Sequence, residues 1–456
     1  MKTRADWIFL LAIMVLAIAL GVVGFRIVAS TNQDIDAYDQ GAYLGMAQSM
    51  KTDLLPARTD GTRNPLFPWL VTRFYDPDSP DFFAAGKRLN VLLAVMGVLL
   101  IGLAAKGRLG SLASWNLAAV SGLGSLLPIS TFFGAEVLFY LFFTGMWVAA
   151  LDHIRRPRVV TGLILGVFSG LAYLAKPSTG PFLAAFAGFV ILLILIKKLW
   201  RNPPAWFLVP DWRTSSAILG LIAALGSYFV IISPRLDSAQ RTYGNAFYSL
   251  PSFWFWADNW KVCVEKYANC TEYGLSKIPP EEWPTAGNYF RRNSPTVAWE
   301  RLMGGTLIKI QQLVIPDGRL PWKAENRNKP KRMLLPGRGW YLVLFGMLAV
   351  VMIAMAKGKP LTDPGGITGL AYGAGVFCLF TFAYGWYHVI GPGPRFVMMF
   401  YIPLCWSFFA SASASAQGHG SARFLTIFHS LLALALGWRV GDLLLNTNFE
   451  KISHAF

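Results

Sequence analysis

Three carboxylates, Asp34, Asp36 and Asp39, lie within six positions in the stretch DIDAYDQGAYLGMAQSM, residues 34–50. The stretch directly follows a long apolar run, so these charges occur where the chain leaves a membrane. The sequence DAYD at 36–39 has the pattern of a capping box, which predicts a helix that begins near Asp36 with Asp36 as its N-cap. Asp39 then falls in the first turn, where the helix dipole favours the ionised carboxylate that a general base requires.

This predicted helix has one continuous face. Asp39, Tyr43, Ala47 and Met50 recur at i, i+4, i+8 and i+11. The spacing predicts an amphipathic helix that lies along the membrane surface, with Asp39 as the charged end of its face. The alternative interpretation is a solvated carboxylate at the start of a loop helix.

Four more ionisable residues are predicted at the membrane depth of Asp39. They are Glu136 in FFGAEVLFYLFF, Lys176 in LAKPSTGP, and His388 and Arg395 in HVIGPGPRF. A carboxylate close to the apolar core is costly and therefore points to function. The alternatives are an exposed loop position for Glu136, a plain interfacial histidine, and cations that extend to lipid headgroups.

Two carboxylates and two cations at one depth suit transfer from a phosphate ester. One carboxylate takes a proton from the acceptor, while the cations stabilise the charge on the leaving phosphate. A phosphate leaving group needs little help from an acid. This separates the pattern from glycoside hydrolysis, in which two carboxyl groups flank the bond that breaks.

The composition indicates an all-α polytopic membrane protein. Of the 456 residues, 54% are hydrophobic and only 14% are charged, whereas about a quarter of a soluble protein is charged. Eleven segments approach the length that spans a hydrocarbon core of about 30 Å. They are 7–28, 89–105, 112–129, 135–151, 159–175, 180–196, 215–233, 340–355, 366–387, 396–411 and 423–445.

The short loops on one side of these segments are rich in Lys and Arg, whereas those on the other side hold only Lys176 and Arg395. The positive-inside rule then predicts a cytoplasmic N-terminus. The net charge of +17 is thus largely a topology signal, and no nucleic-acid partner is expected. Two long loops, 29–88 and 234–339, are predicted outside the cytoplasm.

The loops suggest three parts of the chain. Residues 1–233 form an N-terminal transmembrane region, 234–339 an outer loop subdomain, and 340–456 a C-terminal transmembrane region. The middle part is rich in Trp, Tyr and Pro, which suits a membrane interface or a lid over a sugar-like ligand. It also holds Cys263 and Cys270, which are predicted to form a disulfide outside the cytoplasm, with two unpaired thiols as the alternative.

The order of these motifs resembles that of the GT-C membrane glycosyltransferases that use lipid-phosphate sugars, such as the protein O-mannosyltransferases and the aminoarabinose transferases of lipid A. Their first outer loop carries Asp-Glu, followed by Tyr and then Ile-Ala. Asp39, Gln40, Tyr43 and Ala47 occupy the matching positions, and RNPLFPWL at 63–70 matches a Pro-rich stretch of the family.

The resemblance continues through most of the chain. Glu136 precedes an aromatic-rich fourth helix, and Lys176 occupies a position like that of a Thr-Lys pair in the family. Arg395 and Phe396 precede a tenth helix that contains Pro403. A long outer loop between the seventh and eighth helices also fits.

The resemblance implies an inverting glycosyltransferase. It would move a sugar from a polyprenyl-phosphate donor to a lipid, glycan or protein acceptor of the envelope, on the outer, periplasmic face of a bacterial-type inner membrane. Asp39 is the implied catalytic base, and Glu136 a supporting acid that orients the acceptor or a metal. Lys176, Arg395 and Arg63 are implied to bind the donor phosphate.

Asp36, Tyr43 and His388 are further candidates for supporting the acceptor. The family pattern allows a divalent metal, but Gln40 stands where the family has its second acid, which argues against an Asp-Glu metal pair. A secondary transporter or a flippase for lipid-linked sugars is the alternative function, and it would place charges near the membrane midplane. A noncatalytic scaffold of an envelope complex is a third interpretation.

Overall fold

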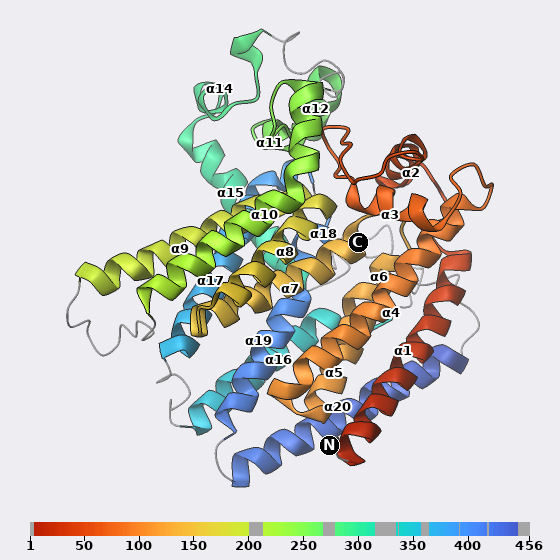
Figure 1. Ribbon diagram of the computed structural model, residues 1–456, viewed down its shortest axis with the longest axis vertical. Helices are drawn as coiled ribbons and strands as arrows, with labels where there is room; N and C mark the ends of the chain where they lie inside the picture. Colours follow the sequence, from red (N-terminus) through yellow and green to blue (C-terminus); the bar gives the residue numbers. More distant parts are fainter. Residues whose placement is uncertain are drawn as a thin grey trace.

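The computed structural model describes residues 4–199, 213–267, 279–314, 334–335, 337–356, 364–391, 393–416 and 419–445. Every regular element within these residues is a helix (Figure 1). Ten helical segments are long and apolar enough to cross a membrane, and α8, with 17 residues, is a shorter apolar helix. The predicted all-α polytopic architecture is therefore confirmed for the described part of the chain.

Each of the eleven predicted segments coincides with a helix of the structure. These helices are α1 (Arg4–Ser30), α4 (Phe82–Leu109), α5 (Ser111–Ser121) with the π-helical turn η1 (Gly122–Leu126) and α6 (Leu127–Ser130), α7 (Glu136–Arg155), α8 (Val159–Ala175), α9 (Gly180–Leu199), α10 (Thr214–Tyr243), α16 (Arg338–Met355), α17 (Pro364–Trp386), α18 (Arg395–Met398) with α19 (Tyr401–Ser415), and α20 (His419–Leu445). The largest difference is at α10, which continues past Pro234 to Tyr243 instead of ending at residue 233.

Glycines set the close contact between α8 and α10. A Cβ atom on Gly162 would lie 2.0 Å from the carbonyl oxygen of Gly220, and one on Gly166 would lie 2.1 Å from that of Ala224. These distances are far below van der Waals contact, so only glycine lets the two backbones approach this closely. Small residues four positions apart bring membrane helices together in this way.

The two long loops lie at the same end of the helix bundle. The first loop contributes α2 (Gln40–Ser49) and α3 (Leu66–Phe74), and the second contributes α11 (Leu250–Trp254), α12 (Trp260–Tyr267), α14 (Ala286–Arg292) and α15 (Pro295–Val314); most of these short helices gather at the top of Figure 1. The loops touch directly, since the Leu250 N–H donates to the Gly61 carbonyl at 2.7 Å. The division of the chain at 233 and 339 stays a prediction.

Cys263 is buried in a small cluster with Leu250, Ala257, Tyr387 and Ile390. This cluster joins the second loop to the segment that follows α17. Burial raises the pKa of the Cys263 thiol to about 12. Its predicted partner, Cys270, lies outside the described residues, so the disulfide stays a prediction.

Candidate functional site

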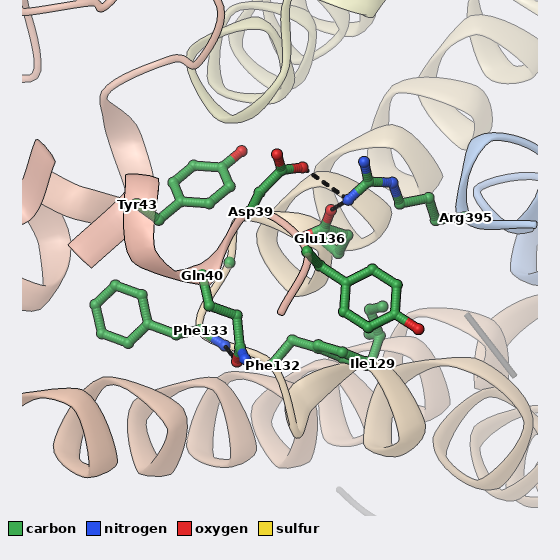
Figure 2. Close-up of a pocket in the computed structure, with 10 residues that line it drawn as sticks. Asp39, Gln40, Tyr43, Ile129, Phe132, Phe133, Glu136 and Arg395 are labelled. Carbon is green, nitrogen blue, oxygen red and sulfur yellow. Dashed lines mark hydrogen bonds and ion pairs between the residues drawn. The ribbon is translucent and has the colours of Figure 1, made fainter. Parts of the chain in front are cut away.

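A pocket lies between the first loop and the starts of α7 and α18. Its walls are formed by residues of 38–43, residues of 129–136, and Arg395, and it encloses roughly 330 Å³ of space that is partly open to solvent. Figure 2 shows Asp39, Glu136 and Arg395 pointing toward one another across this pocket. Segments far apart in sequence thus supply its charged groups.

Asp39 is held between two guanidinium groups. Its Oδ1 lies 2.9 Å from Arg63 Nη2, and its Oδ2 lies 2.8 Å from Arg395 Nη1. Burial alone raises the pKa of the Asp39 carboxyl, but the surrounding cations, Arg395 first, outweigh burial and hold this pKa well below its usual value. Asp39 is therefore ionised throughout the physiological range.

Arg63 is itself shared between two carboxylates. Its Nη1 donates to Asp60 Oδ2 at 2.9 Å, while its Nη2 contacts Asp39. Burial lowers the pKa of Arg63, but the charges of the two carboxylates raise it above the usual value. The guanidinium also lies over the ring of Tyr43, with 5.8 Å from Cζ to the ring centroid. Arg63 is thus oriented by the first loop alone.

Glu136 is the second carboxylate of the pocket and the first residue of α7. It is only 6% exposed, and its Oε1 accepts from Lys176 Nζ at 2.6 Å. The same oxygen lies 3.7 Å from Arg395 Nη1, so Arg395 bridges Glu136 and Asp39. Lys176 directly follows α8, and the C-terminal end of a helix favours a cation.

The charged groups in and beside the pocket balance one another. The carboxylates Asp39, Asp60 and Glu136 face the cations Arg63, Lys176 and Arg395. The two oxygens of Asp39 and the Oε1 of Glu136 already contact N–H donors, so the donor set does not suit a divalent metal. Among the described residues, no group of three or more His, Cys, Asp or Glu side chains is arranged to hold one.

Gln40 has a structural role. Its side chain is 1% exposed and joins two segments that line the pocket. Its amide nitrogen donates to the carbonyl of Asp34 at 2.7 Å, and its Oε1 accepts from the Phe133 N–H at 2.8 Å. Figure 2 shows the second of these contacts. The neutral amide is needed because it donates on one side and accepts on the other.

The predicted capping box at Asp36 is wrong. Helix α2 begins at Gln40, and Asp39 occupies the N-cap position without a side-chain capping bond. Tyr38 adopts a positive φ of 61°, which turns the chain just before Asp39. Asp36 is exposed, and its N–H donates to the carboxylate of Asp34 instead. The helix therefore starts later because the positive φ of Tyr38 interrupts the helical backbone, and Asp39 makes no capping bond because its carboxylate contacts two arginines.

The predicted face of α2 is buried as expected, since Tyr43 is 4% exposed and Ala47 and Met50 are fully buried. Tyr43 also lines the pocket. Burial raises the pKa of Tyr43 well above its usual value, with the carboxylates of the pocket acting in the same direction. Its hydroxyl thus stays protonated and can donate a hydrogen bond to a ligand.

The structure brings five predicted residues into one connected cluster: Asp39, Arg63, Glu136, Lys176 and Arg395. His388 does not join it. That side chain is half-buried in the turn η7 (Tyr387–Val389), within electrostatic range of Lys309 rather than of the carboxylates.

Three supporting residues were not predicted. Asp60 pairs with Arg63, and the Tyr140 hydroxyl donates to the backbone carbonyl of Arg395 at 2.8 Å. Lys309, on α15, contacts the loop that precedes Arg395. The pair of Asp60 and Arg63 could have been predicted from the sequence, because the two residues are only three positions apart. The other two contacts join distant parts of the chain.

No protein-family model matches the chain, and no curated protein matches it. Among solved structures, the chain is similar to the crystal structure of the Archaeoglobus fulgidus oligosaccharyltransferase tethered with an acceptor peptide containing the NVT sequon via a disulfide bond. The TM-score is 0.47 at 13% sequence identity, and the match covers 96% of this chain and 55% of that chain. The chain thus spans about half the length of that structure.

Proposed function

We propose that the protein is an inverting glycosyltransferase that moves a sugar from a polyprenyl-phosphate donor to a lipid, glycan or protein acceptor of the cell envelope. One observation carries the proposal: the continuous series of ion pairs from Asp39 through Arg395 to Glu136 and Lys176. This series combines a carboxylate suited to take a proton with cations suited to hold a phosphate. It lies in a pocket at the end of apolar helices, where a lipid-linked donor would present its headgroup.

In the proposed reaction, the acceptor hydroxyl oxygen attacks the anomeric carbon of the sugar and gives its proton to Asp39. The bond from that carbon to the phosphate oxygen breaks, and the phosphate leaves with the bonding electrons. Attack from the face opposite the phosphate inverts the anomeric configuration. Lys176 and Arg395 stabilise the charge that develops on the phosphate, which is usually the largest catalytic term.

The ion pair between Asp39 and Arg395 must open before Asp39 acts. The cations that hold its pKa below the usual value also make it a weak base. A phosphate competes well for a guanidinium, because both can form paired, charge-assisted hydrogen bonds. We expect the donor to draw Arg395 away, which frees one oxygen of Asp39 while Arg63 keeps the other in place.

The proposed location of this site is the outer face of a bacterial-type inner membrane. The charge distribution of the short loops supports a cytoplasmic N-terminus, with both long loops on the opposite side of the membrane. The donor's polyprenyl tail would remain in the bilayer, while the acceptor would reach the pocket from the aqueous side.

The decisive experiment is transfer by the purified protein in lipid nanodiscs. Polyprenyl-phosphate donors carrying different sugars are offered with envelope extracts, and release of polyprenyl phosphate is measured. Mass spectrometry of envelopes from cells with and without the protein identifies the glycan that depends on it. No turnover of any such donor, together with flux of a lipid-linked sugar across vesicles, would favour the flippase or transporter instead.

A further inference from the structure

Lys309 lies on α15 and is fully buried, with 0% of its surface exposed. Its ammonium nitrogen donates to the backbone carbonyls of Gly391 and Gly393, both at 2.9 Å, and to Gln312 Oε1 at 3.2 Å. All three N–H groups are therefore used. Within the described part of the chain, no carboxylate forms an ion pair with Lys309, so these three oxygens and the nearby ring of Phe396 stabilise its charge.

The pattern of α15 explains how a lysine comes to be buried. Its inward face carries Thr306, Lys309 and Gln312, whereas Trp299 and Leu307 are more than 60% exposed. Polar groups thus face the protein and apolar groups face outward, which is the reverse of a helix on a soluble protein. These inward polar groups need hydrogen-bond partners, and Lys309 has two of its partners in the loop beside α15.

That loop leads directly to Arg395. Gly393 and Pro394 immediately precede Arg395, which begins α18. The Lys309 ammonium also lies 5.2 Å from the ring centroid of Phe396, the residue that follows. On the other side, the Tyr140 hydroxyl holds the Arg395 carbonyl. The backbone of Arg395 is thus anchored from two helices, α7 and α15.

We propose that Lys309 is a positioning residue, which fixes Gly391, Gly393 and the start of α18 so that the Arg395 side chain bridges Asp39 and Glu136 and meets the donor phosphate. The deduction about donor binding rests on the proposed function, whereas the anchoring of the loop does not. Lys309 does not touch the donor in this assignment, because it is fully buried and has no free N–H.

The first test measures backbone hydrogen exchange and needs no substrate. In Lys309→Met, which keeps the length of the side chain without its N–H donors, the amides of Gly391 and Val397 should exchange at least tenfold faster. These amides bond to the carbonyls of Tyr387 and Pro394, on either side of the anchored loop. Lys261→Met serves as the control, since its side chain is 79% exposed on α12. Unchanged exchange in a folded Lys309→Met protein would overturn the proposal.

The second test uses transfer kinetics. Lys309→Met should raise KM for the donor about tenfold or more and change kcat less. The double variant with Arg395→Ala should be little worse than Arg395→Ala alone, because both changes remove the same contact. Losses that multiply independently would show that Lys309 does not act through Arg395. If the parent protein transfers no sugar, the proposed function fails, and the exchange test still decides the anchoring.

A pH profile gives a third readout. Burial lowers the pKa of Lys309 to about 7, and the charge of Arg395 acts in the same direction. Among the described residues, His388 is also within electrostatic range of Lys309. As pH rises through about 7, Lys309 loses its charge, so KM for the donor should rise. This rise should be absent in Lys309→Met and present in His388→Gln. Its persistence in Lys309→Met, or its loss in His388→Gln, would count against the proposal.

Discussion

At the scale of single residues, Asp39 is the centre of the candidate site. Its two oxygens contact different guanidinium groups, one supplied by its own loop and one by α18. Such a carboxylate is well oriented but is not free to accept a proton. The catalytic interpretation therefore depends on a ligand that competes for Arg395, and a phosphate has the charge and geometry to do so.

We expect Asp39→Asn to lower the rate of sugar transfer by about 10²- to 10⁴-fold, the usual contribution of a general base, because an amide does not take the proton. The measurement is transfer from a polyprenyl-phosphate donor, with size-exclusion chromatography as a check of folding. Asp36→Asn is the matched control, since Asp36 is exposed in the same loop. Transfer at the parent rate by Asp39→Asn would remove this residue from the mechanism.

Lys176 and Arg395 should both determine how well the donor is used. Loss of a charge-assisted contact in a partly desolvated site costs about 1.5–3 kcal/mol, so Lys176→Ala and Arg395→Ala should lower kcat/KM for the donor roughly tenfold to hundredfold. Arg395→Lys should recover only part of this loss, because an ammonium lacks the planar fork that can hold a phosphate through two parallel hydrogen bonds.

The control for these cations is Lys51→Ala. Lys51 is in the same loop as Asp39, but its side chain is half exposed and pairs with Asp76 and Asp78. Rates within about twofold of the parent for the Lys176 and Arg395 variants, equivalent to less than ~0.5 kcal/mol, would mean that neither residue holds the donor and that their ion pairs are only structural.

At the scale of elements, Gln40 connects α2 to the segment before α7. We expect Gln40→Glu, which would place an Asp-Glu pair at positions 39–40, to destabilise the protein rather than create a metal-dependent enzyme. The new carboxylate would face the carbonyl oxygen of Asp34 and would lose its donated hydrogen bond. The cost should be about 1–3 kcal/mol, as for a buried polar group left without its partner.

The stability of Gln40→Glu is measured by thermal unfolding in detergent, with and without added Mg²⁺ or Mn²⁺. Gln40→Ala should also be destabilised, since it leaves the Asp34 carbonyl and the Phe133 N–H without this partner. A Gln40→Glu protein as stable as the parent, and more active with metal, would contradict the structural role of Gln40.

The contact between α8 and α10 offers a second test at this scale. Gly162→Ala would place a methyl group 2.0 Å from the Gly220 carbonyl oxygen, so the helices must separate. We expect a loss of about 1–3 kcal/mol in the free energy of unfolding, the usual cost of overpacking. Gly226→Ala, on α10, is the control, because a Cβ there meets nothing within 4 Å. Equal stability of the two variants would refute the close contact.

At the scale of the whole molecule, the loops of both predicted outer segments meet at the end of the bundle that holds the pocket. Arg235, in the C-terminal half of α10, connects the two loops. Its guanidinium donates to the Asn64 side chain of the first loop and to the backbone carbonyls of Ala246 and Tyr248 in the second. The second loop thus helps to hold the first loop, whose residues 38–43 line the pocket.

The predicted orientation can be tested with a membrane-impermeant maleimide on intact cells. Asp36→Cys should be labelled from outside, whereas Arg156→Cys should be labelled only after permeabilisation; both positions are exposed at opposite ends of the bundle. The parent protein controls for its own cysteines. Labelling of Arg156→Cys in intact cells would reverse the topology and move the pocket to the cytoplasmic face.

The sequence by itself was sufficient to predict the helices that cross the membrane and the residues that carry charge at their ends. Hydropathy is a local property, so eleven apolar segments are visible without knowledge of how they pack. The charged residues at their ends were visible for the same reason, because an ionisable group beside an apolar run is conspicuous. The order of the motifs also predicted that Asp39 and Arg395 belong to the same site.

Only the tertiary structure decided which of these charges meet. Asp39 and Arg395 are 356 positions apart, and their contact depends on the order and rotation of the packed helices, which no local pattern encodes. The same reason explains the errors. The chain turns at Tyr38, which brings Asp39 to Arg395 instead of continuing a helix from Asp36, and Lys309 went unnoticed because its backbone partners come from another segment. Local signals specify elements, whereas long-range electrostatics and packing specify the site.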